Sequence, residues 1–311
     1  MSFRWVYANP VDGGAVDSLQ QALFGNPANR SATSKLSPRA SRTIARLLAL
    51  RGINTYEQAK QFFRPDLSEL YDPFLMRDME LASTRLASAI RHSETVVVYG
   101  DYDVDGTTAT AIVYSFLKSF GTKVHHYIPH RFKEGYGISE DGIEYAIEQH
   151  AHLIVSVDCG ITAVEEAKYA REKGIDLIIC DHHTAGDVIP DAVAVLDPKR
   201  PDCPYPFDGL SGAGVGFKLV QATLTKLGLP QSVAYQYLDL VAISIASDIV
   251  PLIDENRILM REGLKLVNTQ PRIGVKALLE QIKMEIGKIS TSNIVFSIGP
   301  RINAAGRMGD A

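Results

Sequence analysis

Short apolar runs alternate with longer amphipathic segments from about residue 94 onward. The runs are rich in β-branched residues and have the length of strands: Thr95–Tyr99, Val124–Ile128, Leu153–Val157, Leu177–Cys180 and Ala192–Leu196. Strands that alternate with helix-length segments are typical of a sheet whose strands run parallel. The pattern therefore predicts an α/β fold with a mostly parallel sheet flanked by helices.

Helical patterns precede and follow this region. Ser37 and Pro38 have the order of an N-cap and a first helical residue, and apolar positions recur at helical spacing as far as Gly52. The polar face of that helix suits either phosphate contact or a solvated surface through Arg39, Arg42 and Arg46. Further helices are expected at about 213–227, 233–246 and 256–284.

Composition limits the class of protein. With 311 residues, 46% of them hydrophobic, the chain can bury domain-sized cores, which argues against disorder. No apolar run approaches the roughly 18 residues that span a bilayer, and the N-terminus lacks a signal-peptide pattern, so we expect a cytoplasmic protein without a membrane partner. Only three cysteines occur, with no CxxC pair, which argues against a disulfide scaffold and a zinc site.

The formal net charge of −4 at first argues against a nucleic-acid partner, because nucleic-acid-binding domains are usually basic. Several aspartates nevertheless cluster in motifs that suit metal ions. Two bound divalent ions would add four positive charges to such a site. The net charge therefore does not exclude DNA as a substrate.

Three carboxylates lie in one expected strand-to-helix loop. The loop DYDVDG follows the strand TVVVY and supplies Asp101, Asp103 and Asp105. The same pattern opens an EF-hand calcium loop, whose twelfth position is a glutamate and whose preceding element is a helix. Here the twelfth position is Ile112 and a strand precedes the loop, so the EF-hand interpretation fails.

Two further polar groups directly follow expected strands. Asp158 comes after LIVSV, and Asp181, His182 and His183 come after DLIIC. In an open parallel sheet, the loops at the carboxyl ends of neighbouring strands converge on one crevice. A single aspartate after a strand is usually a helix cap. Three acidic strand ends, one of them with paired histidines, instead predict a shared site.

A fourth acidic residue, Asp248, ends the otherwise apolar run LDLVAISIAS. Burying a carboxylate there is costly without a cation or hydrogen-bond partners, and a metal ion would be such a partner. Carboxylates with imidazole suit Mn²⁺ or Mg²⁺. The glycine-rich run 209–218 lacks the phosphate-loop pattern GxxxxGK[ST] and predicts a tight helix start with a close backbone approach.

In this order and spacing, DYDVDG, SVDCG, DHH and ASDIVP resemble motifs one to four of the DHH phosphoesterases, over about residues 95–255. The resemblance implies two Mn²⁺ ions, with Mg²⁺ as a substitute, held by these ligands: Asp103 and Asp158 for one ion, and Asp105, Asp158, His182 and Asp248 for the other. It also implies that His183 lies against the scissile phosphate and that Asp181 orients a neighbouring histidine.

Tyr99 is a departure from the pyrophosphatase-like members of this family. They have a metal-binding histidine four residues before the position of Asp103, where this chain has the tyrosine. The first metal site therefore has fewer protein ligands. Asp101 is a further candidate ligand for it.

Three other segments resemble the RecJ exonucleases within this family: residues 36–86, the loop IPHRFKEGYG and the tail GPRINAAGRMGDA. The resemblance implies a 5′→3′ exonuclease that releases 5′-mononucleotides from single-stranded DNA in DNA repair and recombination. The candidate DNA contacts are Arg131 and Tyr136 in the loop, and Arg301, Asn303 and Arg307 in the tail. The alternatives are a solvent-exposed turn for the loop and a brace between domains for the tail.

The resemblance also implies a domain order. We expect a helical extension over 1–90, a DHH catalytic domain over 91–255, a connecting helix over 256–290 and the start of a DHH-associated domain over 291–311. RecJ proteins continue beyond the equivalent of Ala311. The chain is therefore expected to be a catalytic-core fragment whose second domain is truncated.

Two other functions remain open at this stage. A DHH enzyme that acts on short oligonucleotides, cyclic dinucleotides or pyrophosphate would need the same metal motifs. A non-catalytic replication scaffold with the DHH fold would have lost motif residues, whereas every motif acid and both histidines are present here. In a hydrolase of this kind the nucleophile would be a metal-activated hydroxide and not a side chain.

Overall fold

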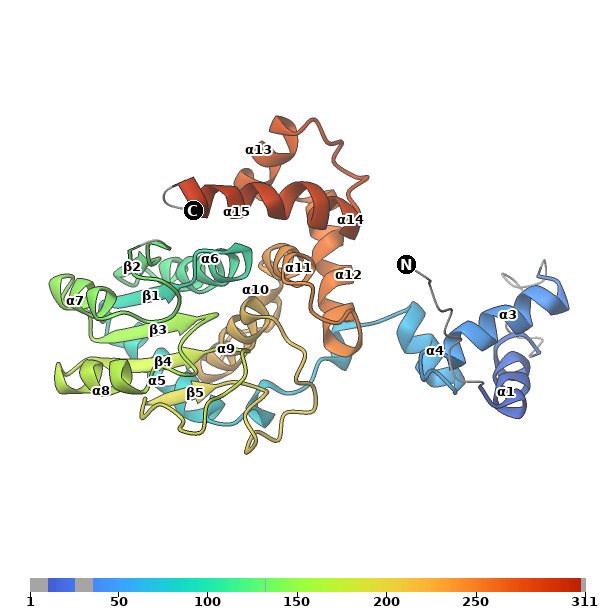
Figure 1. Ribbon diagram of the computed structural model, residues 1–311, viewed down its shortest axis with the longest axis horizontal. Helices are drawn as coiled ribbons and strands as arrows, with labels where there is room; N and C mark the ends of the chain where they lie inside the picture. The colour runs from blue at the N-terminus through green and yellow to red at the C-terminus, as the bar shows by residue number, and fades with distance from the viewer. Residues whose placement is uncertain (1–10, 26–35, 132, 309–311) are drawn as a thin grey trace, which may run out of the picture. The chain divides into compact units, whose positions relative to one another are not determined.

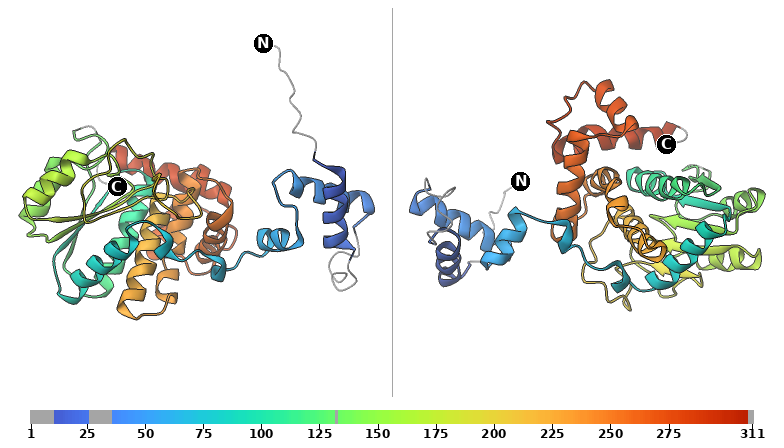
Figure 2. Two further views of the ribbon diagram at one scale, coloured as in Figure 1. Left: turned by 90° about the horizontal axis from the view of Figure 1, so that it is seen from below. Right: turned by 180° about the vertical axis from the view of Figure 1, so that it is seen from behind.

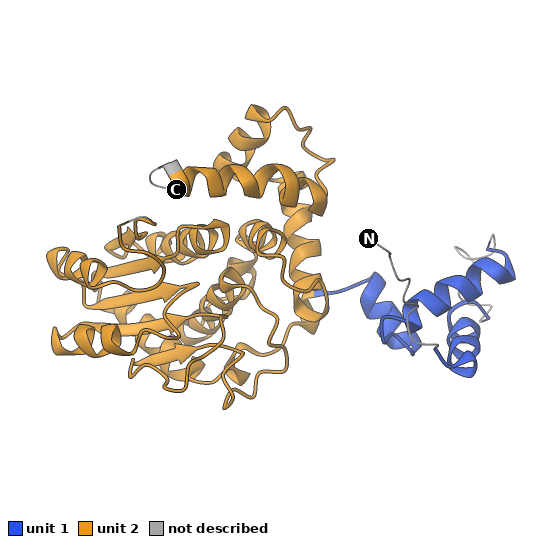
Figure 3. Cartoon of the chain, viewed as in Figure 1, with its two compact units in different colours: residues 1–66 blue, residues 67–311 orange. Residues whose placement is uncertain are grey.

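The computed structural model describes residues 11–25, 36–131 and 133–308. The chain divides into two compact units, residues 1–66 and residues 67–311 (Figure 3). Each unit has a core of its own, and each is described by itself. The division differs from the helical extension over 1–90 that the sequence led us to expect.

Helices α1 (Gly13–Phe24), α3 (Pro38–Ala49) and α4 (Tyr56–Phe63) form the first unit. Ser37 caps α3 by accepting a hydrogen bond from the amide of Ala40, in agreement with the predicted helix start. Apolar side chains from all three helices bury a small core: Val16, Leu19, Ala45, Leu48 and Ala59.

The second unit is built on a parallel sheet whose strand order is β2-β1-β3-β4-β5 (Figure 1). Its strands are β1 (Val96–Gly100), β2 (Val124–Tyr127), β3 (Leu153–Val157), β4 (Asp176–Cys180) and β5 (Ala194–Leu196). Every residue of β1 and β3 is buried. Their continuous apolar runs are explained by helices that cover both faces of the sheet. The predicted fold class is confirmed.

Two helical layers cover the two faces of this sheet, which Figure 2 views from two further sides. Val96 and Val98 of β1 lie in one core, and Val97 and Tyr99 lie in the other, as the two-residue period of a strand requires. The first core is shared with α5 (Met79–Arg91), α6 (Val104–Ser119) and α9 (Gly212–Leu227). The second is shared with α7 (Glu140–Glu148) and α8 (Val164–Glu172).

Helix α5 belongs to the second unit because of its packing. It lies against α9 and β5. Its Arg85 also donates hydrogen bonds to Asp176, at the start of β4, and to Glu94. The first unit therefore ends before α5, between Asp66 and Leu67 and not near residue 90.

Helices and helical turns make up the regular structure of the second unit outside the sheet layers. They are η2 (Leu67–Glu69), η3 (Pro73–Leu75), α10 (Ser232–Tyr235), α11 (Leu238–Ser247), α12 (Asp254–Thr269), α13 (Ile273–Gln281), α14 (Thr291–Asn293), the π-helical turn η4 (Ile294–Ile298) and α15 (Gly299–Met308). Although α11 is almost wholly apolar, no helix in the described ranges is both long and apolar enough to cross a membrane.

The connecting helix expected over 256–290 is not continuous. It divides into α12 and α13, because Pro271 has no amide hydrogen and disfavours the helical conformation at Gln270, where ψ is 57°. The helix expected over 233–246 likewise divides into α10 and α11. The tail with the candidate DNA contacts Arg301, Asn303 and Arg307 is helical over residues 299–308.

A buried ion pair ties α9 to α12. Lys218 and Glu255 are both fully buried, and Lys218 Nζ lies 2.5 Å from Glu255 Oε1. Glu255 also accepts hydrogen bonds from the amide of Tyr71 and the hydroxyl of Tyr205. Several partners compensate each charge, as burial requires. The network thereby holds the turn between α11 and α12, where Asp248 is located, against the helices of the sheet.

Candidate metal centre

The acidic groups of the motifs meet at the carboxyl edge of three neighbouring strands. Gly100 of β1 pairs with Val157 of β3, and Val157 pairs with Cys180 of β4. Asp101, Asp158 and Asp181 are the residues that directly follow these three aligned positions. The parallel register therefore places these three aspartates side by side, because neighbouring strands end at the same edge.

Asp105 is held by the N-terminus of α9. It is only 1% exposed. Its carboxylate accepts hydrogen bonds from the amides of Gly212, at 2.7 Å, and Ala213, at 2.8 Å. Ser244 of α11 donates a third bond to it, at 2.7 Å. Free amides and the positive end of the helix dipole favour a carboxylate at this place. Helices α9 and α11 thereby fix the side chain of Asp105.

Asp158 adopts a left-handed backbone conformation, with φ of 61°. Asparagine and aspartate tolerate this conformation better than most residues, and such strain often occurs at functional sites. The backbone of Gly212 approaches this residue so closely that a Cβ atom there would lie 2.5 Å from Asp158 Oδ1. This confirms the close backbone approach predicted for the glycine-rich run.

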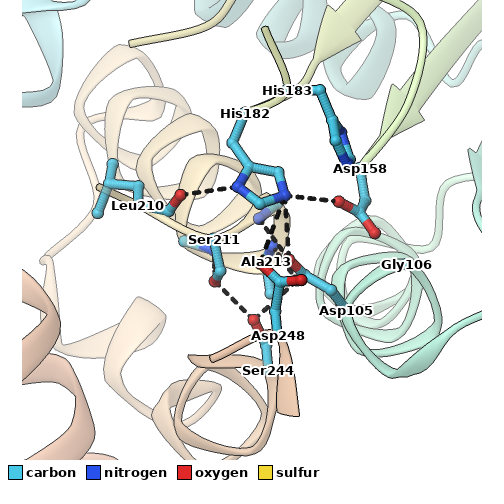
Figure 4. A network of polar contacts seen from close by, with 12 residues as sticks. Asp105, Gly106, Asp158, His182, His183, Leu210, Ser211, Ala213, Ser244 and Asp248 are labelled. Carbon is cyan, nitrogen blue, oxygen red and sulfur yellow. Dashed lines mark hydrogen bonds and ion pairs between the residues drawn. The ribbon is translucent and has the colours of Figure 1, made fainter. Parts of the chain in front are cut away.

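His182 presents an unprotonated nitrogen to three carboxylates (Figure 4). Its Nδ1 lies 3.0 Å from the carbonyl oxygen of Leu210, which can only accept, so Nδ1 carries the proton. The pKa of His182 is lowered, chiefly by burial. Its Nε2 therefore offers a lone pair toward three carboxylate oxygens: Asp158 Oδ1 at 3.1 Å, Asp105 Oδ2 at 3.5 Å and Asp248 Oδ2 at 3.7 Å.

Four potential metal-ligand atoms thus converge around His182. Asp158 Oδ1 and His182 Nε2 are buried and have no hydrogen-bond partner among the described residues. Such an arrangement is unfavourable unless a cation satisfies it. The donor set of carboxylates and one imidazole suits a hard divalent ion. The residues present therefore fit a metal ion at this point.

A second group of donors shares Asp158 with the first. Ligand atoms of Asp101, Asp103 and Asp158 all lie within 4.8 Å of one another. Asp101 Oδ1 is buried without a hydrogen-bond partner among the described residues. Asp103 caps α6 by accepting a hydrogen bond from the amide of Gly106. The structure therefore brings together a second set of oxygen donors beside His182.

Tyr99 has a structural role in place of the histidine found in pyrophosphatase-like relatives. It is fully buried in the core on the α7 side of the sheet. Its hydroxyl donates to the carbonyl of Gly137 and accepts a hydrogen bond from the amide of Ser139. The ring therefore braces the segment before α7 and supplies no donor to the acidic cluster.

Burial raises the pKa of the clustered aspartates. Burial is the largest cause for Asp101, whose pKa rises to about 6, and for Asp248, whose pKa rises to about 7. The pKa of Asp105 is raised, and that of Asp158 is raised well above its usual value, again chiefly by burial. A bound cation reverses this effect, because it favours the ionised carboxylates.

His183 differs from His182 in its partners and its exposure. Its side chain is 45% exposed, and its Nδ1 lies 2.7 Å from Asp181 Oδ1. This hydrogen bond is the largest cause of its raised pKa. Asp181 is itself fixed by the amides of Ile161 and His182. The hydroxyl of Tyr136 lies 2.9 Å from the same nitrogen and donates to the carbonyl of Asp158.

The remaining candidate substrate residues differ in whether they contact the segments that carry this cluster. Arg131 is exposed and stacks over the ring of Tyr102, inside the motif-one loop, at 5.0 Å. Asn303 Oδ1 accepts a hydrogen bond from the amide of Val104, between two motif acids. Arg301 donates to the carbonyl of Ser297, and Arg307 is exposed in the last turn of α15. No contact joins these two arginines to the cluster among the described residues.

Sequence reasoning missed two groups near the site. Ser244 donates to Asp105 from the middle of an apolar helix, where one serine gives no signal of its own. Lys199 is exposed just after β5, and its charge is among the smaller influences on the pKa values of His182, His183 and Asp248. Asp197 directly follows β5 and is fully buried, so the same rule applied to β5 would have found Asp197 and drawn attention to Lys199 two residues later.

Comparison with known proteins gives this geometry a family. Residues 95–245 match the DHH family, N-terminal domain. The chain is 42% identical over 308 residues to the single-stranded-DNA-specific exonuclease RecJ of Bacillus subtilis, covering 99% of this chain and 36% of that protein. It covers 48% of the Escherichia coli protein of the same name. The chain thus spans about a third to a half of the length of these curated relatives.

Solved structures agree with the sequence relatives. A crystal structure of exonuclease RecJ bound to manganese is 36% identical, with a TM-score of 0.70, covering 79% of this chain and 60% of that one. The Thermus thermophilus RecJ structure with Mn²⁺ is 33% identical, with a TM-score of 0.72, covering 86% of this chain and 37% of that one. The chain therefore belongs to the DHH family, in its RecJ branch.

Proposed function

We propose that this chain carries the catalytic centre of a metal-dependent 5′→3′ exonuclease that releases 5′-mononucleotides from single-stranded DNA. The observation that carries the proposal is the convergence of His182 Nε2 and oxygens of three buried or half-buried aspartates within 3.7 Å of it. The names of the relatives and their Mn²⁺-bound and Mg²⁺-bound structures support the same activity. We place this activity in DNA repair and recombination in the cytoplasm.

The proposed ligands form two sets that share Asp158. Asp103, Asp158 and Asp101 would hold one divalent ion. Asp105, Asp158 and Asp248, which all lie near His182 Nε2, would hold the other together with His182. Mn²⁺ is the proposed ion, with Mg²⁺ as a substitute. The bound ions would supply an activated water and would neutralise charge on the attacked phosphate.

The remaining side chains would position the phosphate and hold the ligands. Asp181 fixes the Nδ1 proton of His183, so that Nε2 of this half-exposed ring is left free to meet a phosphoryl oxygen. The hydroxyl of Tyr136 contacts the same ring and also donates a hydrogen bond to the carbonyl of Asp158, so it ties His183 to the backbone of motif two. Arg131, which stacks over Tyr102 of the motif-one loop, has the planar guanidinium that suits a phosphate. Arg301 and Arg307 are the proposed contacts farther along the strand.

A digestion of end-labelled DNA tests the proposal. With Mn²⁺, a 5′-labelled single strand should release its label in the first cleavage as a mononucleotide, and a 3′-labelled strand should shorten gradually. Duplex DNA of the same sequence should be cut far more slowly, and EDTA should stop every reaction. A 3′-labelled strand that loses its label first would contradict the polarity.

The same assay separates the rival functions. Dinucleotides or pyrophosphate that are hydrolysed faster than long single strands would favour a small-substrate enzyme of the DHH family. Absence of any hydrolysis, with Mn²⁺ bound, would favour a scaffold. The scaffold outcome is not expected, because every motif acid and both histidines are present and the acids lie together in the folded chain. The small-substrate outcome is not expected, because the relatives are named as single-stranded-DNA-specific exonucleases.

A further inference from the structure

Helix α15 contacts two segments that supply candidate metal ligands. It lies across α6 and α11, which are distant in sequence from each other (Figure 1). Asn303, in the middle of α15, accepts a hydrogen bond at 3.2 Å from the amide of Val104, the first residue of α6. Val104 stands between Asp103 and Asp105 in the chain. The helix therefore reaches the backbone of the motif-one loop itself.

The N-terminal end of α15 is packed against the end of α11. A Cβ atom on Gly299 would lie 2.7 Å from Ser247 Oγ, so only glycine fits without a shift of that side chain. Ser247 directly precedes Asp248, the candidate ligand from this helix. Thus α15 touches the backbone that carries Asp103 and Asp105 and also the residue before Asp248, although no residue of α15 is itself a candidate ligand.

The bond to Val104 matters for the carboxylates beside it. The first amides of a helix have no acceptor within the helix and need one from elsewhere. At the start of α6, Asp103 already accepts from the amide of Gly106. Without Asn303, the amide of Val104 would compete for the oxygens of the neighbouring aspartates. An amide oxygen from α15 therefore leaves the charged oxygens of the loop available to a cation.

We propose that Asn303 is a positioning residue of the metal centre, which sets the geometry of the motif-one ligands from helix α15 and does not act primarily as a DNA contact. This role rests on the metal centre of the proposed function but not on the nuclease activity. Partners that orient the ligands of a metal site typically change metal affinity by about 10–100-fold when they are removed.

Titration of the whole chain with Mn²⁺ alone, in the absence of DNA, tests this role. Asn303→Ala should weaken Mn²⁺ binding by about tenfold or more, within the range seen for such supporting groups. Asn303→Asp keeps the acceptor oxygen and should retain at least the wild-type affinity. Arg301→Ala is the matched control on the same helix, since Arg301 donates only to Ser297 among the residues that the structure describes, and it should leave the Mn²⁺ affinity in the absence of DNA unchanged.

Thermal unfolding measured first with EDTA and then with Mn²⁺ separates a loss of metal affinity from a loss of fold stability. A folded Asn303→Ala chain whose melting temperature rises less than that of the wild type on addition of Mn²⁺ supports the proposal. If that variant does not fold, Asn303→Ser, which is too short to reach Val104, provides the same comparison. Unchanged Mn²⁺ affinity with weaker DNA binding would overturn the proposal. A wild-type chain that binds Mn²⁺ without cutting DNA would refute the proposed function and leave this role standing.

Discussion

At the scale of single residues, two adjacent histidines are set apart by their hydrogen-bond partners. The Nδ1 of His182 donates to a backbone carbonyl, which leaves its Nε2 as a lone-pair donor deep in the acidic cluster. The Nδ1 of His183 is paired with the carboxylate of Asp181, and its ring is half exposed. Burial lowers the pKa of His182, whereas the hydrogen bond to Asp181 raises the pKa of His183 and favours its positively charged form.

We therefore expect different defects from substituting the two histidines. His182→Ala should weaken Mn²⁺ binding by about 10–100-fold, and excess Mn²⁺ should restore part of its activity. His183→Ala should retain Mn²⁺ affinity and should lower the maximal rate at saturating Mn²⁺. Rates measured across a Mn²⁺ titration check both expectations. Full rescue of both variants by excess Mn²⁺ would show that His183 is a ligand or a peripheral group.

At the scale of elements, the N-terminus of α9 organises the site without supplying a metal ligand. Its first amides hold Asp105, and its first residue, Gly212, lies against Asp158. The two acids come from different strand-end motifs, so α9 sets the distance between them. The glycine is required by space and not by backbone conformation, because its φ is not among the positive values of the described chain.

This role predicts opposite results at two glycines of one helical turn. A Cβ at position 212 would lie 2.5 Å from Asp158 Oδ1, whereas at position 214 the nearest atom would lie 3.5 Å away, an ordinary contact. Gly212→Ala should therefore weaken Mn²⁺ binding and lower activity. Gly214→Ala should keep both and gain up to about 1 kcal/mol of helix stability. Equal behaviour of the two variants in metal titration and thermal unfolding would contradict the packing argument.

The sequence predicted the strands and the meeting of their acidic ends. Apolar β-branched runs identify buried parallel strands, and a parallel register places Asp101, Asp158 and Asp181 at one edge. Both inferences use local patterns and a general rule of topology. They did not need long-range contacts, which is why they could be made before the structure.

Features that depend on distant contacts were not predictable in the same way. The hydrogen bond from Val104 to Asn303 joins residues 199 positions apart, and the one from Ser244 to Asp105 joins residues 139 apart. No local pattern encodes such pairs. The break at Pro271 is different, because proline itself carries a local signal for the end of a helix within a segment whose charged pattern is otherwise helical.

At the scale of the whole molecule, net charge bears on the proposed binding of DNA. The 311 residues have a formal net charge of −4. In the proposed function, attraction to a single strand would therefore come from bound metal and from scattered cations such as Arg131 and Lys199. A long basic groove is not expected from this balance of charges.

We accordingly expect weak binding of single-stranded DNA by these 311 residues and slow, distributive cleavage. Because binding would depend on phosphate neutralisation, the affinity should fall steeply and log-linearly with salt. A salt titration of binding, beside a gel of product lengths at low enzyme concentration, measures both properties. Tight binding at physiological salt with processive degradation would show that the residues of this chain suffice to track a strand.

Asp158 belongs to both proposed ligand sets and would hold both divalent ions, and a calorimetric Mn²⁺ titration of wild type and Asp158→Asn tests this assignment most directly. Asparagine keeps the side-chain shape and tolerates the left-handed backbone at this position, so the fold should persist. We expect two Mn²⁺ per wild-type chain and weakened binding at both sites in the variant, with an unchanged or higher melting temperature in EDTA because carboxylate repulsion is relieved. A wild-type chain that binds no Mn²⁺, or a variant that binds two ions as tightly as wild type, would contradict the account.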